Sequence, residues 1–167
     1  MRFLNFGNRE RGPAMSEVTA SCLSLHVLGA CQASGENINN LKLQKLLYYS
    51  QAWYLAIYNK PLFNDPIQAW VHGPVVPIVF QAYKYSGWSP IYIEYPACLL
   101  GTSLPNHLKT HLEKVLSAYG GLSGWDLERL THREDPWRIA RAGLPPDASS
   151  NAVISHDSMK TYYRQNG

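Results

Sequence analysis

The apolar positions of this chain are densest in residues 41–59. Between the polar first turns of this stretch and its last residue, every side chain is apolar or aromatic except Ser50 and Gln51. These two neighbours point about 100° apart on a helix, so they do not give it a polar face. A helix that is apolar around its circumference belongs in a protein interior. We therefore predict a buried helix over 41–59, capped by Asn39 or Asn40.

Shorter stretches with helical spacing flank this segment on both sides. Ser123 and Asp126 have the spacing of a capping box, and a Gly-Gly pair marks a stop after residue 119. Other helix starts are marked by a Ser or Asp cap, or by proline at the first helical position. We predict six further helices: 17–33 capped by Ser16, 77–86, 105–119, one that Ser123 begins and that ends near Leu130, 136–142 capped by Asp135, and one that Ser155 begins.

Two extended stretches interrupt the helical pattern. Residues 67–71 form a short apolar run bounded by turn signals, and residues 88–96 alternate in polarity. Pairing of these two stretches predicts a small hairpin-like sheet. Between them, Gly73 and Pro74 turn the chain towards the helix that Pro77 begins. The predicted fold class is mainly α: a single compact helical domain around a buried central helix, with a small two-stranded β element.

Length and composition fit one domain. A chain of 167 residues with 46% apolar and 16% charged side chains is typical of a globular protein. We expect residues 15–167 to form that domain and residues 1–14 to be a flexible N-terminal extension. The formal net charge is +3, and the extension alone contributes +2 of it. The nearly neutral remainder has no basic cluster, which argues against nucleic acid as a partner.

The three cysteines do not indicate a disulfide framework. Their number is odd, and Cys22 and Cys31 lie about 13 Å apart along one predicted helix. The first residues have no apolar core of signal-peptide length, and the chain has no run of about 18 apolar residues. We therefore expect reduced thiols, no membrane segment and a cytoplasmic location.

Four histidines are candidates for chemistry. His107 and His111 stand one helical turn apart, as two metal ligands on a helix would, but no glutamate lies between them, and an exposed helix face is favoured. His72, beside a Gly-Pro corner, is either a general base or a side chain that ties the corner through backbone groups, and we favour the tie. His132 lies in the polar cluster 131–135, which suits capping. The alternative function is a metal-dependent hydrolase that uses these four histidines.

The order of residues shows no assembled catalytic set. Cys98 has no cysteine or histidine at catalytic-pair spacing, and there is no phosphate-binding glycine loop and no Ser-His-Asp arrangement. Spacing alone therefore names no activity, and neither a metal nor another cofactor is expected.

Four stretches together resemble the Panacea domain family of SocA-like antitoxins and phage-associated proteins. The resemblance extends from about residue 16 to residue 165, and it is most specific over 42–49 and 70–77. The stretches are LKLQKLLYYSQAW (41–53), IQAWVHGPVVPIVFQAYKYSG (67–87), LTHREDPWRIAR (130–141) and ISHDSMKTYYRQ (154–165).

The resemblance implies an antitoxin that is not an enzyme and that neutralises a cognate protein toxin by direct contact. One family member resembles an adaptor that passes a toxin to a cytoplasmic protease, so a protease is a second candidate partner. Neither role needs a metal or a cofactor. A third hypothesis is a DNA-binding autorepressor, which the weak basic patterning does not favour. The sequence leaves self-association open.

The resemblance does not assign the residues that touch a toxin. Aromatic side chains and their polar neighbours are the natural candidates, because tryptophan, tyrosine and arginine dominate binding at protein interfaces. Each candidate also fits a role in the core or in capping. The predicted partner-binding residues are Tyr83, Trp88, His132, Arg133 and Trp137.

Overall fold

Helices make up most of the regular structure in the computed structural model, which describes residues 16–94 and 103–166. The predicted mainly α class with a small two-stranded element is confirmed. In chain order the elements are α1 (Ala20–Ala33), α2 (Asn40–Tyr58), β1 (Gln68–Trp70), β2 (Gly73–Val75), α3 (Pro77–Tyr83), a 3₁₀ turn η1 (Lys84–Ser86), α4 (Asn106–Tyr119), α5 (Gly124–Thr131), α6 (Asp135–Ala140) and α7 (His156–Gln165).

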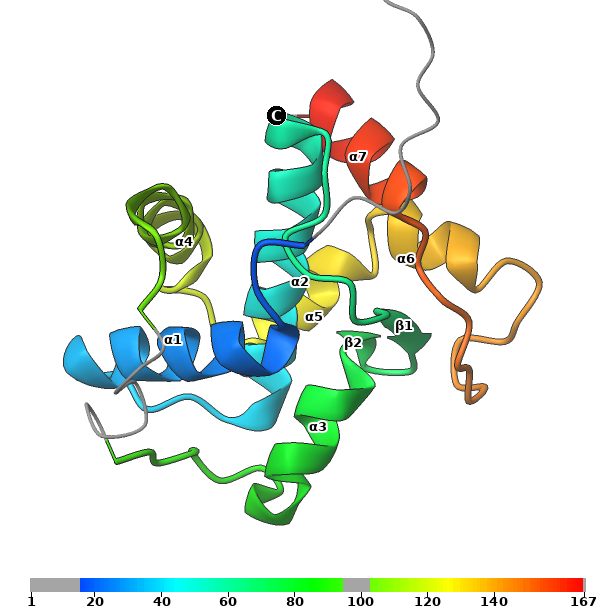
Figure 1. Cartoon of the computed structure of the whole chain (residues 1–167). Helices are drawn as coiled ribbons and strands as arrows, with labels where there is room; N and C mark the ends of the chain where they lie inside the picture. The colour runs from blue at the N-terminus through cyan, green and yellow to red at the C-terminus, as the bar shows by residue number, and fades with distance from the viewer. Residues whose placement is uncertain (1–15, 95–102, 167) are drawn as a thin grey trace, which may run out of the picture.

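Helix α2 is the centre of the arrangement, and α1, α4, α5 and α7 pack around it (Figure 1). All its side chains from residue 42 to residue 51 are buried. Asn39 caps the first turn, because its side chain accepts a hydrogen bond of 3.0 Å from the backbone N–H of Lys42. Asn59, with a φ of 57°, ends the helix in the left-handed conformation. The predicted buried central helix is confirmed to within one residue at each end.

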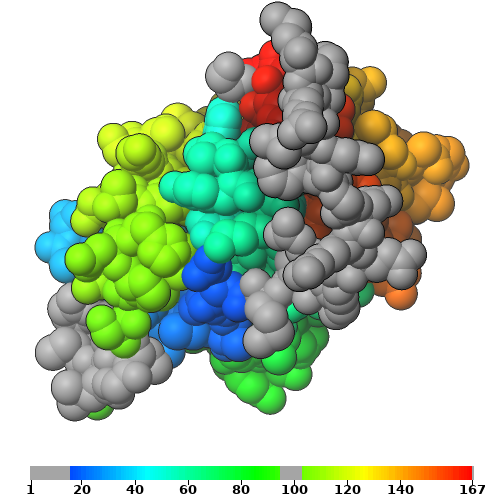
Figure 2. Space-filling model, turned by 45° about the horizontal axis from the view of Figure 1, so that its top comes forward, coloured from blue at the N-terminus to red at the C-terminus, as the bar shows by residue number. Residues whose placement is uncertain are grey.

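The C-terminal end of α2 reaches the surface. Ile57 and Tyr58 are exposed there, and Figure 2 shows this end and the segment after it between α4 and α7. At the other end, polar side chains such as Gln44 and Lys45 break the apolar character of the helix. Within the described ranges, no helix is long and apolar enough to cross a membrane.

The small sheet is a tighter hairpin than the sequence predicts. β1 pairs antiparallel with β2, so the predicted pairing of 67–71 with 88–96 is wrong. Gly73, with a φ of 94°, turns the chain back at once, which gives β1 a local partner. The opposite edge of β1 bonds to the segment before α7, because Ala69 N donates to Ala152 O at 2.8 Å. The described part of 88–96 contains no strand, and Ile91 N bonds to Ile38 O instead.

Two predicted helix starts move by one to three residues. α1 begins at Ala20 and is capped by Thr19 rather than Ser16, because the backbone N–H groups of Glu17 and Val18 both donate to Leu62 O. The N-cap of α6 is the residue before Asp135, and its side chain makes no cap hydrogen bond. Residues 77–86 form α3 followed by η1, and the remaining predicted helices agree with the structure to within one or two residues.

Candidate functional site

A cleft of about 760 Å³ opens between the N-terminal turns of α2, the β1–β2 hairpin, α3 and the segment 149–151. Its volume is in the range of pockets that hold a drug-sized ligand or an anchor side chain of a partner protein. Trp70, Phe80 and Trp88 give it an aromatic lining, and Lys45 lies in its wall. It is the site that the described residues offer most clearly.

Side chains of α2 hold the hairpin that forms one wall of the cleft. Gln44 Oε1 accepts from Val76 N at 2.8 Å, and Lys45 Nζ donates to Pro74 O at 3.1 Å. A Cβ at Gly73 would lie 2.7 Å from Lys45 Cε, so only glycine fits between the hairpin and α2. The backbone groups near the Gly-Pro corner are therefore tied by α2, and not by His72 as the sequence suggested.

His72 instead points to α5 and to the mouth of the cleft. Its Nδ1–H donates to Glu128 Oε1 at 3.1 Å, and more than half of its side chain is exposed. Its ring lies edge-on to the rings of Trp88 and Trp125, with centroids 6.0 and 6.2 Å away. The imidazole is therefore in T-shaped contact with both indole rings.

Trp88 and Trp125 form an exposed stacked pair at this mouth. Their ring centroids are 5.3 Å apart with an interplanar angle of 21°, yet the two residues remain 61% and 54% exposed. Two indoles that are both stacked and exposed form one contiguous apolar surface, and such a surface marks a candidate binding site. We call Trp88, Trp125 and His72 the aromatic rim.

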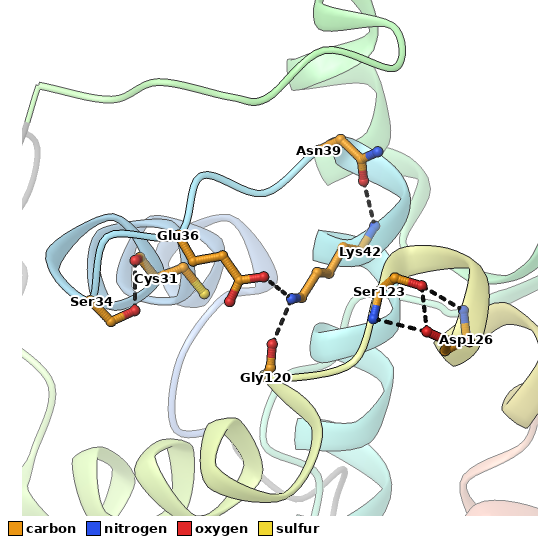
Figure 3. Close-up of polar contacts among 8 residues, drawn as sticks. All are labelled: Cys31, Ser34, Glu36, Asn39, Lys42, Gly120, Ser123 and Asp126. Carbon is orange, nitrogen blue, oxygen red and sulfur yellow. Dashed lines mark hydrogen bonds and ion pairs between the residues drawn. The ribbon is translucent and has the colours of Figure 1, made fainter.

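Figure 3 shows polar contacts at the start of α2, where Lys42 meets Glu36 and Gly120. Asn39 Nδ2 donates to Trp88 O at 3.4 Å, and Lys42 Nζ donates to Gly120 O at 2.6 Å and also pairs with Glu36. The same figure shows the capping box of Ser123 and Asp126, which begins α5 just before Trp125. The predicted capping pair is confirmed, and it fixes the first turn of α5, which carries Trp125.

Two charged side chains, Lys45 and Glu128, lie behind the rim. Lys45 is wholly buried, and burial lowers the pKa of its ammonium to about 7 although the charge of Glu128 opposes this shift. Glu128 Oε2 is buried and has no hydrogen-bond partner among the described residues. Burying such groups costs solvation free energy, and the bond from Lys45 Nζ to Pro74 O offsets part of that cost.

The stability of the protein is expected to rise with pH between 7 and 9 because of Lys45. Its folded-state pKa is lowered, so the unfolded chain binds more protons in this window, and unfolding becomes harder as the pH rises. The slope is about 1 kcal/mol per pH unit. Urea unfolding at pH 7, 8 and 9 measures it, and Lys45→Met should flatten the slope while keeping the fold. An equal slope in both proteins would show that Lys45 is not its source.

The five predicted partner-binding residues do not share one surface. Trp88 lies on the aromatic rim, but Trp137 is buried, and its Nε1–H donates to Trp70 O at 2.9 Å. His132 stacks on Trp137 with centroids 4.0 Å apart, so the two support the hairpin from behind. Tyr83 is half-buried against the core, and Arg133 is exposed. Trp137 therefore has the core position that the sequence also allowed, and a toxin contact of these five residues stays a prediction.

The four histidines of the hydrolase alternative have different neighbours. His111 is buried and its Nε2–H donates to Ser50 O at 2.9 Å, which corrects the predicted exposed face, while His107 is exposed beside Glu17. Burial lowers the pKa values of His111 and His132. Over residues 16–94 and 103–166, no three His, Cys, Asp or Glu side chains are grouped as a metal site would need. Cys98 lies outside the described residues.

Two features of the site are missing from the sequence predictions. Trp125 is not among the candidates, although it precedes Leu127 by two residues and so lies off the apolar face of α5.

The second missing feature is the role of Glu134, whose buried carboxylate accepts from three tyrosine hydroxyls of α2 and α7. The distances are 3.3 Å to Tyr48, 3.0 Å to Tyr49 and 2.6 Å to Tyr163.

The fold and the cleft define a mainly α protein that is built around a buried tyrosine-rich helix and has an aromatic cleft beside the first turns of that helix. Residues 43–138 match the family model "Antitoxin SocA-like, Panacea domain", and this range contains the hairpin, both rim tryptophans and Glu134. Antitoxin SocA of Caulobacter vibrioides (strain NA1000 / CB15N) is 34% identical over 138 residues, which cover 76% of this chain and 72% of that protein. The chain belongs to the SocA-like Panacea domain family of antitoxins, which confirms the resemblance. No solved structure matches.

Proposed function

We propose that this chain neutralises a cognate protein toxin by direct contact, and that the toxin covers the aromatic rim. The observation that carries the proposal is the stacked pair of Trp88 and Trp125, which stays more than half exposed at the mouth of the cleft. Tryptophan is the residue most enriched at binding hot spots, and a rigid stacked pair loses little entropy when a partner covers it.

Family membership supports the same role. The relative in Caulobacter vibrioides is named an antitoxin, and the range that matches the family model includes the three rim residues and Glu128. We infer that the chain acts as a binding protein and not as an enzyme. The polar groups around the cleft support this inference. His72 is bonded to Glu128 beside the indoles and Lys45 is bonded to the hairpin, so the two side chains are not directed at a common reacting atom.

The test is co-expression with the protein encoded by the adjacent reading frame. If that protein is the toxin, its expression alone should stop growth, and co-expression of this chain should restore growth and yield a complex that stays together in gel filtration. Growth rescue without a complex, or no complex with the product of either neighbouring frame, would contradict direct neutralisation.

The fate of the toxin separates the two modes of neutralisation. If this chain blocks the toxin by coverage, the toxin accumulates in the complex and its half-life rises. If the chain is an adaptor in the cytoplasm, toxin half-life falls when this chain is present, and deletion of the responsible protease removes the protection. A pulse-chase measurement with and without this chain decides between them.

A further inference from the structure

The lining of the cleft is basic as well as aromatic. Among the described residues that line it there is no aspartate or glutamate, whereas Lys45, Lys84 and His72 do line it. Lys45 is wholly buried, so Lys84 is the cation that a ligand in the cleft meets. A ligand that covers Lys84 removes water from its ammonium, so a ligand with negative charge is favoured over a neutral or basic one.

Glu128 compensates only part of this positive charge. Its carboxylate faces His72 Nδ1 and acts on Lys45, but it is largely buried behind the rim. Lys84 is exposed at the end of α3, where its Nζ lies 5.1 Å from the centroid of the Tyr85 ring. None of the ion pairs within the described ranges includes Lys84. Lys84 therefore places a positive charge at the open side of the cleft, where a carboxylate of a ligand can pair with it.

We propose that the cleft accepts an acidic segment of the toxin, with an apolar side chain against Trp88 and a carboxylate beside Lys84. The inference rests on the proposed function, since the segment belongs to the bound toxin. His72 offers the segment a second polar contact, because its Nδ1–H is engaged by Glu128 and its Nε2 is left to accept a hydrogen bond from a backbone N–H of the segment.

A single-stranded nucleic acid also combines negative charge with flat rings, but the cleft is poorly suited to it. Recognition of bases uses free hydrogen-bonding edges of side chains. Three of the four amide side chains that line this cleft make hydrogen bonds within the protein: Asn40 Nδ2 donates to Phe80 O, Gln44 Oε1 accepts from Val76 N, and Gln68 Oε1 accepts from Trp70 Nε1. A polypeptide that needs only apolar contact and one or two ion pairs fits this surface better.

The experiment measures the affinity of the full chain for the product of the adjacent reading frame at 50 and 500 mM NaCl. Lys84→Glu is expected to weaken binding roughly tenfold at 50 mM, because it replaces attraction by repulsion, and the gap should shrink at 500 mM. The neutral variant Lys84→Gln should fall between the two. Lys109→Glu, which places the same charge change on exposed α4, is the matched control and should stay within about twofold.

The outcomes distinguish failure of the acidic-segment proposal from failure of direct neutralisation. If the toxin binds the wild-type chain but Lys84→Glu binds as well or better at both salt concentrations, the acidic segment is overturned and direct neutralisation stands. If the wild-type chain binds no toxin, both fall. If a 20-nucleotide single strand binds, displaces the toxin and is lost in Lys84→Glu, the cleft is a nucleic-acid site and the inference is overturned.

Discussion

Replacing Trp88 with alanine is expected to weaken the complex with the toxin about 100-fold. The substitution removes the larger exposed part of the stacked pair and leaves Trp125 without its neighbour. The backbone contact of Trp88 with Asn39 uses the carbonyl oxygen, so it survives the substitution. Calorimetric titration with the purified toxin measures the effect.

Ile57→Ala is the matched control for lost apolar surface. Ile57 is 56% exposed at the far end of α2, away from the hairpin (Figure 1), and its truncation should change affinity by less than about twofold. Thermal unfolding of Trp88→Ala should stay close to that of the wild type, because an exposed side chain contributes little to folding stability. Unchanged affinity in Trp88→Ala would remove the aromatic rim from the interface and leave the antitoxin family assignment intact.

The helices were largely predictable because their signals are local. Asn39, Pro77, Ser123 and Ser155 each cap or begin a helix through groups within three residues, and the apolar run of α2 has no alternative to burial. The start of α1 was not predictable in this way. Its preceding N–H groups bond to Leu62 O, which lies more than forty residues away in sequence.

The hairpin and the site depend on contacts that sequence periodicity does not contain. The apolar run 67–71 could pair with either neighbouring stretch, and the choice follows from the positive φ of Gly73 and from the bonds of β1 to the segment before α7. Trp88 and Trp137 look alike in sequence, since each follows a glycine or proline and precedes a polar residue. Their burial differs because β1 lies over Trp137 and nothing described lies over the outer side of Trp88.

Glu134 joins three elements of the core through one carboxylate. It lies just before α6 and accepts hydroxyl hydrogen bonds from Tyr48 and Tyr49 of α2 and from Tyr163 of α7. Burial raises its pKa, and the three hydroxyl donors oppose that shift by stabilising the charged form. The same burial, together with the charge of Glu134, raises the pKa values of these tyrosines, so their hydroxyls remain donors.

Glu134→Ala is expected to lower the free energy of unfolding by about 3–5 kcal/mol, because it leaves three buried hydroxyls without an acceptor. Tyr163→Phe removes one donor and should lower it by only about 1.5–3 kcal/mol, the range for a hydrogen bond to a charged group. Urea unfolding measures both, and Glu113→Ala on exposed α4 controls for the loss of a carboxylate.

The two changes should also couple, which distinguishes a shared hydrogen-bond network from separate packing effects. In the Tyr163→Phe background, Glu134→Ala leaves two buried hydroxyls without an acceptor instead of three. The loss of unfolding free energy caused by Glu134→Ala should therefore be smaller in this background than in the wild type, by at least about 1 kcal/mol. If Glu134→Ala does not fold, the same cycle run with Glu134→Gln, whose amide oxygen still accepts, gives the coupling. Strict additivity would show that the carboxylate is not the joint acceptor. α2 and α7 would then be held together by the packing of their aromatic rings and by other bonds, such as that from Arg164 Nε to Ala56 O.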